Sequence, residues 1–145
     1  MPKLAEFQAR MKGPDADDAL KAATDLANYY IIYNEEYNTL IEKQQQAEIA
    51  LYNVTHNPTG VDQAEALRLQ GLILWSGSRM KFLDEKMLAF HASTVSIKPP
   101  SKTLVEQVKQ LTAQIATLIA KDQAIKGIIG ALTELSGLVN KTHGA

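Results

Sequence analysis

The fold is decided by one stretch, Leu104 to Val139, which reads LVEQVKQLTAQIATLIAKDQAIKGIIGALTELSGLV. Core-type positions recur along it at alternating spacings of three and four residues. They are Leu104, Val108, Leu111, Ile115, Leu118, Asp122, Ile125, Ile129, Leu132, Ser136 and Val139. A spacing of 3.5 sustained over several heptads indicates helices that pack side by side along a seam. The phase continues unchanged past Gly127 and Gly130, so this stretch predicts one long helix.

Two earlier stretches of the chain carry the same alternating pattern. In the first the positions are Ala19, Ala23, Leu26, Tyr30, Tyr33, Tyr37, Leu40, Gln44, Ala47, Leu51 and Val54, and in the second Ala66, Leu69, Ile73, Ser76, Met80, Leu83, Met87 and Phe90. Gln44 and Asp122 are polar residues in otherwise apolar seams, and such residues commonly fix the register of helix packing. The pattern therefore predicts three amphipathic helices of coiled-coil type.

Proline and glycine mark the ends of these helices. Gly13-Pro14 precedes the first, Asn57-Pro58-Thr59-Gly60 separates the first from the second, and Pro99-Pro100 precedes the third. The predicted helices cover residues 16–56, 62–92 and 103–140. Because short connections make successive helices antiparallel, we expect an all-α, elongated, antiparallel three-helix bundle with up-down-up order. Residues 1–14 form an amphipathic N-terminal arm, and residues 15–145 form a single helical-bundle domain.

Composition and charge narrow the class of partner. The chain of 145 residues is 46% apolar and 21% charged, and it contains no cysteine, which excludes a disulfide framework and a thiolate site. A formal net charge of -1 does not favour a nucleic-acid partner, since phosphate recognition leaves a basic footprint. Residues 1–7 lack the apolar stretch of a secretory signal and no window is long enough for a spanning helix, so we expect a cytoplasmic protein on synthesis.

Catalytic and metal-binding patterns are not found in the sequence. The three histidines, His56, His91 and His143, are scattered and match no metal-ligand spacing. Glu35 and Glu36 are the nearest approach to an acid pair, but neighbouring helical residues point about 100° apart and so do not converge. We expect both to lie on a solvated face. The sequence thus predicts no enzyme, no metal and no cofactor.

Apolar residues exceed what the seams need in two regions. Residues 19–33 carry apolar side chains off the seam, and residues 124–139 carry a second apolar stripe beside the seam. A helix that is apolar most of the way round must be covered on most sides. The candidate partner-binding residues come from these regions, the arm and the second helix. They are Leu4, Phe7, Met11, Tyr29, Ile32, Trp75, Phe82, Ile128, Leu135 and Leu138.

This excess of apolar surface carries the functional prediction. We expect a non-enzymatic protein that binds protein, by self-association or with a partner chain, as an interaction or structural assembly component. The alternative is a membrane-active helical protein, pore-forming or part of virion ejection, that inserts its third helix. That alternative is disfavoured because the helix lacks the lysine-rich polar face usual in interfacial helices.

Overall fold

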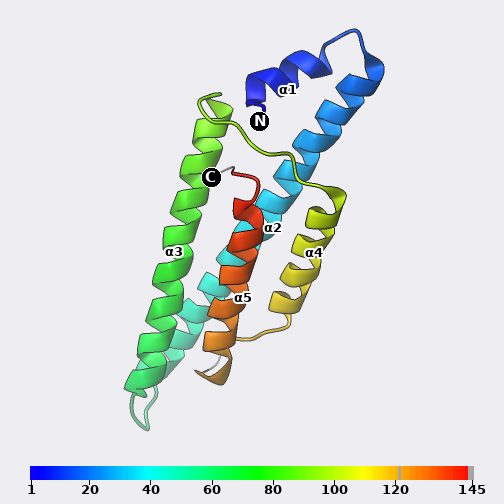
Figure 1. The fold of residues 1–145 in the computed structure, drawn as a ribbon. Helices are drawn as coiled ribbons and strands as arrows, with labels where there is room; N and C mark the ends of the chain where they lie inside the picture. The colour runs from blue at the N-terminus through cyan, green and yellow to red at the C-terminus, as the bar shows by residue number, and fades with distance from the viewer. Residues whose placement is uncertain (121, 144–145) are drawn as a thin grey trace.

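The computed structural model describes residues 1–120 and 122–143, with side chains at all of them except residues 122 and 123, and five α-helices form its regular structure. They are α1 (Leu4–Met11), α2 (Ala16–Thr55), α3 (Gln63–His91), α4 (Lys102–Ala116) and α5 (Asp122–Asn140). The longest helix, α2, contacts all four others, and α5 lies between α3 and α4 (Figure 1). The described part of the chain is therefore an all-helical structure of packed helices.

The first two long helices begin and end close to their predicted bounds. The Asp15 carboxylate caps α2 by accepting hydrogen bonds from the amides of Asp17 and Asp18, and Asp62 caps α3 by accepting from the Glu65 amide. Between them the chain reverses at Gly60, whose φ of 123° lies in a region that favours glycine. Proline and glycine placement thus located this turn correctly.

The third predicted helix, residues 103–140, is not one helix but two, α4 and α5, which pack against each other. The last turn of α4 tightens as the amides of Thr117 and Leu118 donate to carbonyl oxygens three residues earlier, at 3.2 and 3.0 Å. Folding back places α5 in contact with α2, α3 and α4. This position covers both apolar stripes of α5, which a straight continuation of α4 would leave partly bare.

The interior is divided into two apolar clusters. The larger one joins α2, α3, α4 and α5, and its fully buried residues include Ile32, Leu40, Leu69, Leu72, Leu83, Ile115, Ile125, Ile128, Leu132 and Leu135. The smaller one consists of Phe7, Ala22, Tyr29, Phe90 and Ile97 at the end of the bundle where α1 docks. The N-terminal arm is thus anchored to the chain's own core by Phe7.

Aromatic rings hold α1 in place. The Phe7 ring lies 6.3 Å from the Phe90 ring, and Tyr29 lies 5.1 Å from Phe90, both in edge-to-face geometry. On the outside, Arg10 of α1 and Asp18 of α2 form an ion pair at 2.9 Å. In Figure 1 α1 lies across the end of the long helices, at a steep angle to them.

An extended segment between α3 and α4 connects the two ends of the chain. The Ile97 amide donates to the Pro2 carbonyl at 2.9 Å, and the Lys98 amide donates to the Thr142 carbonyl at 2.8 Å. Lys3 and Ser96 form an isolated antiparallel bridge. Residues 95–98 therefore act as a strap that holds both terminal segments at one end of the bundle (Figure 1).

Candidate protein-interaction site

A charged network lies inside the bundle where α2, α3 and α5 meet. Arg79 of α3 donates two hydrogen bonds to the Glu36 carboxylate of α2, at 2.7 and 2.8 Å, and the Ser136 hydroxyl of α5 donates to the same carboxylate at 2.7 Å. The Glu36 side chain has no exposed surface and that of Arg79 is nearly buried. The prediction that Glu36 lies on a solvated face is wrong. Its carboxylate instead links three helices through charge-assisted hydrogen bonds.

The neighbouring acid points to a different helix. Glu35 accepts a hydrogen bond of 2.6 Å from the Thr112 hydroxyl of α4, so the two adjacent carboxylates contact different elements. Their divergence follows from the rotation of about 100° between successive helical residues. The geometry of Glu35 and Glu36 therefore serves packing and provides no paired acid and base.

A second buried charge fixes the end of α4. The ammonium group of Lys43, fully buried on α2, donates to the Leu118 carbonyl at 2.6 Å and to the Gln46 side chain at 3.2 Å. The side chain of the next residue, Gln44, donates to the Ile73 carbonyl of α3 at 3.2 Å. Gln44 thus makes the interhelical contact expected of a polar seam residue, while the side chain of Asp122, the other such residue, lies outside the described part.

Tyrosines and histidines meet near the docked arm. The Tyr29 hydroxyl lies 3.3 Å from His143 Nε2, and Tyr30 lies 3.0 Å from His91 Nε2. Burial raises the pKa of Tyr29 well above its usual value, and burial together with the Asp84 charge raises the pKa of Tyr33 to about 12. Burial, followed by the charges of Arg79 and Lys86, lowers the pKa of His143 to about 4. At neutral pH these three groups are therefore uncharged packing residues.

The predicted partner-binding residues are divided between core and surface. Five of them are fully buried in the chain's own clusters: Phe7, Tyr29, Ile32, Ile128 and Leu135. Leu4, Trp75 and Leu138 are half-buried, while Met11 and Phe82 are exposed. The apolar excess of residues 19–33 and 124–139 is thus covered largely within the chain, by α1, by the strap and by the fold-back of α5.

Helix α3 carries large apolar side chains that are exposed at a regular spacing. Leu67, Leu74 and Leu88 are 66%, 71% and 73% exposed, and they follow one another at multiples of seven residues. They belong to a row of exposed positions at alternating spacings of four and three, here called the outer seam: Leu67, Gly71, Leu74, Ser78, Lys81, Glu85, Leu88 and Ala92. This row lies opposite the buried side of α3 and has the pattern of a helix-packing seam.

The face around the outer seam is nearly free of charge. Residues Gln63, Ala64, Gln70, Phe82 and Ala89 flank the seam at 100° per residue. Lys81 and Glu85 are the only charged residues of the seam and these flanking positions. A solvent-facing helical surface normally carries mostly polar and charged side chains. This face therefore has the chemistry of a helix contact, although no helix in the described structure covers it.

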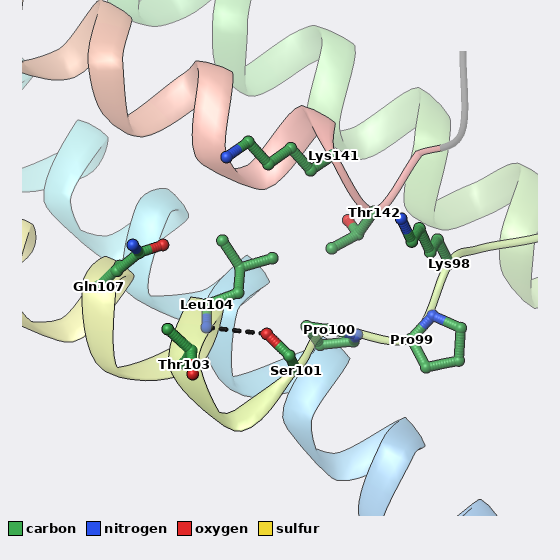
Figure 2. A pocket seen from close by; sticks show the side chains of 9 residues that line it. All are labelled: Lys98, Pro99, Pro100, Ser101, Thr103, Leu104, Gln107, Lys141 and Thr142. Atoms are coloured by element: carbon green, nitrogen blue, oxygen red, sulfur yellow. Dashed lines mark hydrogen bonds between the residues drawn. The ribbon is translucent and has the colours of Figure 1, made fainter.

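Several shallow hollows lie elsewhere on the described surface, and two of them differ clearly in their lining. Figure 2 shows the one at the strap, of about 260 Å³, where Pro99, Pro100 and Ser101 face Lys141 and Thr142 and the Ser101 hydroxyl caps α4 by accepting from the Leu104 amide. The other, of about 380 Å³, is lined mainly by apolar residues of α2 and of the connection between α4 and α5, including Ile49, Val54 and Ile119. Neither hollow shows converging catalytic groups.

The described residues include no group of three or more histidine, aspartate and glutamate side chains with the arrangement of a metal site. None of the described helices combines the length and the apolar character needed to cross a membrane. Comparisons with models of known protein families, with curated proteins and with solved structures find no match to this chain.

Leu67, Leu74 and Leu88 are not among the predicted partner-binding residues, most of which lie where apolar residues are densest in the sequence. The second helical stretch has a moderate density overall, so these leucines did not stand out. Their separation by multiples of seven, on the side opposite the inner seam, was the available signal.

Proposed function

We propose that this chain is a non-enzymatic helical protein that acts by binding another protein, as a component of an assembly, through the outer seam of α3. The observation that carries the proposal is the row of Leu67, Leu74 and Leu88, exposed at helix-packing spacing on a nearly uncharged face. Exposed apolar patches of this kind mark interaction surfaces in soluble proteins.

The hydrogen bonds inside the bundle support the proposal that its surface binds a partner. The buried charges of Glu36, Arg79 and Lys43 are hydrogen-bonded to neighbouring helices, so they hold the scaffold in one arrangement. A rigid helix with an apolar outer row binds a partner helix at a lower entropic cost than a flexible segment does. Trp75 and Phe82, at the edges of the outer seam, would add aromatic contact area to such an interface.

Site-specific photo-crosslinking tests this proposal. A benzophenone amino acid placed at position 74, in the cells that naturally make the protein, should give a covalent adduct with a defined protein partner. The matched control is position 20 on α2, where the leucine is 68% exposed but lies outside the outer seam. Changing Leu67 and Leu88 to aspartate should remove the adduct at position 74. Equal adduct formation at positions 74 and 20, or none at either, would refute the proposal.

A further inference from the structure

We propose that the outer seam from Leu74 to Ala92 packs against the same residues of a second copy of this chain, with the two α3 helices antiparallel. The inference rests on the proposed function, because it names the partner that the outer seam binds. The observations that carry it are the spacing of the outer seam and the position of its only two charges, Lys81 and Glu85.

In an antiparallel pair of identical helices, the position of the two-fold axis determines which residue of the partner lies opposite each residue. With the axis at the level of residue 83, Leu74 faces the partner's Ala92, Ser78 faces the partner's Leu88, and Lys81 faces the partner's Glu85. Each of these pairs joins an a position of one helix to a d position of the other, as antiparallel packing requires. Large side chains meet small ones, and each positive charge meets a negative one.

The charges discriminate against the other arrangements. In a parallel pair in register, Lys81 would face the partner's Lys81 and Glu85 would face the partner's Glu85, which is repulsive at both levels. In the antiparallel register one heptad away, Glu85 would face the partner's Leu74 and would lose water without gaining a counter-charge. The register centred at residue 83 is the arrangement that pairs both charges.

Contacts within one chain prepare the centre of this interface. Phe82 is 36% exposed and lies beside the seam between Lys81 and Leu83. The Arg79 guanidinium and the Lys86 ammonium lie 4.8 and 5.4 Å from its ring centroid, and the His143 ring lies 6.1 Å away, so these contacts hold the ring at the edge of the seam that faces the C-terminal segment. In the proposed pair, Phe82 and the partner's Phe82 lie within one helical turn of each other, next to the two-fold axis.

Among the described residues, the side chains of Lys81 and Glu85 form no hydrogen bond or ion pair with another part of the chain. Both are exposed, and within the described part neither forms an ion pair. Substitution of either residue should therefore leave folding intact, which far-ultraviolet circular dichroism can verify. Any effect of these substitutions on association can then be attributed to the contact between copies.

Sedimentation equilibrium of the full chain over roughly 1 to 100 µM tests the proposal. The wild type should show a monomer–dimer equilibrium. Lys81→Glu and Glu85→Lys should each weaken dimerisation by about tenfold or more, because like charges then face each other. The double variant Lys81→Glu/Glu85→Lys should recover to within about threefold of wild type. Leu74→Asp should abolish the dimer, whereas Leu20→Asp, on another helix, should leave it unchanged.

Two results would overturn the inference. One is a wild type that remains monomeric throughout this concentration range, and the other is a double variant that associates as weakly as the two single variants. A monomeric wild type that still gives an adduct with a different protein from position 74 removes the second copy as partner and leaves the proposed function standing. A monomeric wild type without any adduct removes both.

Discussion

Glu36 lies at the one described point where α2, α3 and α5 share a polar contact. Its carboxylate accepts hydrogen bonds from Arg79 and Ser136 while fully removed from water. Breaking a buried ion pair by removing one charge leaves the other charge without a partner, which is strongly destabilising. We therefore expect the loss of the Glu36 carboxylate to lower the stability of the fold more than the loss of any exposed acid.

Glu36→Gln should lower the free energy of unfolding by about 3 kcal/mol, since Arg79 then remains nearly buried without its counter-charge. Urea denaturation followed by circular dichroism measures this change. Glu48→Gln, at an exposed position of the same helix, is the matched control and should change stability by less than about 0.5 kcal/mol. The double variant Glu36→Gln/Arg79→Met should be less destabilised than Glu36→Gln alone. Equal effects of Glu36→Gln and Glu48→Gln would contradict this role.

The connection between α4 and α5 is the element that separates this fold from a three-helix bundle. The residues Thr117–Ala120 include neither glycine nor proline, and the seam pattern runs through them without a change of phase. The tertiary contact that marks the turn is the hydrogen bond from the Lys43 ammonium to the Leu118 carbonyl. A residue on α2 thus satisfies a carbonyl of the connection that directly follows α4.

Lys43→Met keeps the apolar stem of the side chain but removes the donor, and it leaves the Leu118 carbonyl unsatisfied. We expect a loss of about 2 kcal/mol in stability. Hydrogen exchange should become faster at the amides near the end of α4 and the start of α5, while the amides between α2 and α3 keep their protection. Lys126→Met, at an exposed position of α5, is the control. A uniform increase in exchange along all helices would argue against a local role for Lys43.

At the scale of the whole molecule, Pro2 near the N-terminus and Thr142 after α5 are both hydrogen-bonded to the same strap. The Tyr29–His143 contact and the hydrogen bond between Lys98 and Thr142 hold the C-terminal segment there. Among the described residues, His143 Nδ1 is buried without a hydrogen-bond partner, and the pKa of this histidine is lowered from 6.5 to about 4. Below about pH 6.5 the unfolded chain therefore binds a proton that the folded chain does not. Stability falls as the pH decreases from about 6.5 to about 4.

The free energy of unfolding of the wild type should fall between pH 7 and pH 5 by about 1 kcal/mol more than that of His143→Gln. This figure allows for the partial exposure of the ring. Urea denaturation at the two pH values measures the difference. Asn38→Gln, at an exposed position without a titratable side chain, should show the same pH dependence as the wild type. Identical pH slopes for the wild type and His143→Gln would refute the contribution of His143.

The sequence by itself determined the all-helical class, the bounds of α2 and α3 to within one residue, and most of the buried positions of α3, α4 and α5, whereas on α2 most buried residues lie off the predicted seam. These features depend on local chemistry, because helix caps, turn residues and the alternating spacing act within a few residues of each other. The sequence also showed the apolar excess at residues 19–33 and 124–139, but it did not show which elements cover these residues.

Only the tertiary structure decided that α4 and α5 fold back on each other and that Glu36 and Lys43 are buried. The spacing of a seam is the same in a straight helix and in one that folds back between three neighbours, so periodicity cannot distinguish them. Likewise, a glutamate or lysine is buried only when a partner such as Arg79 or the Leu118 carbonyl lies within hydrogen-bond distance. Those partners are more than forty residues away in sequence, and only the packed bundle brings them together.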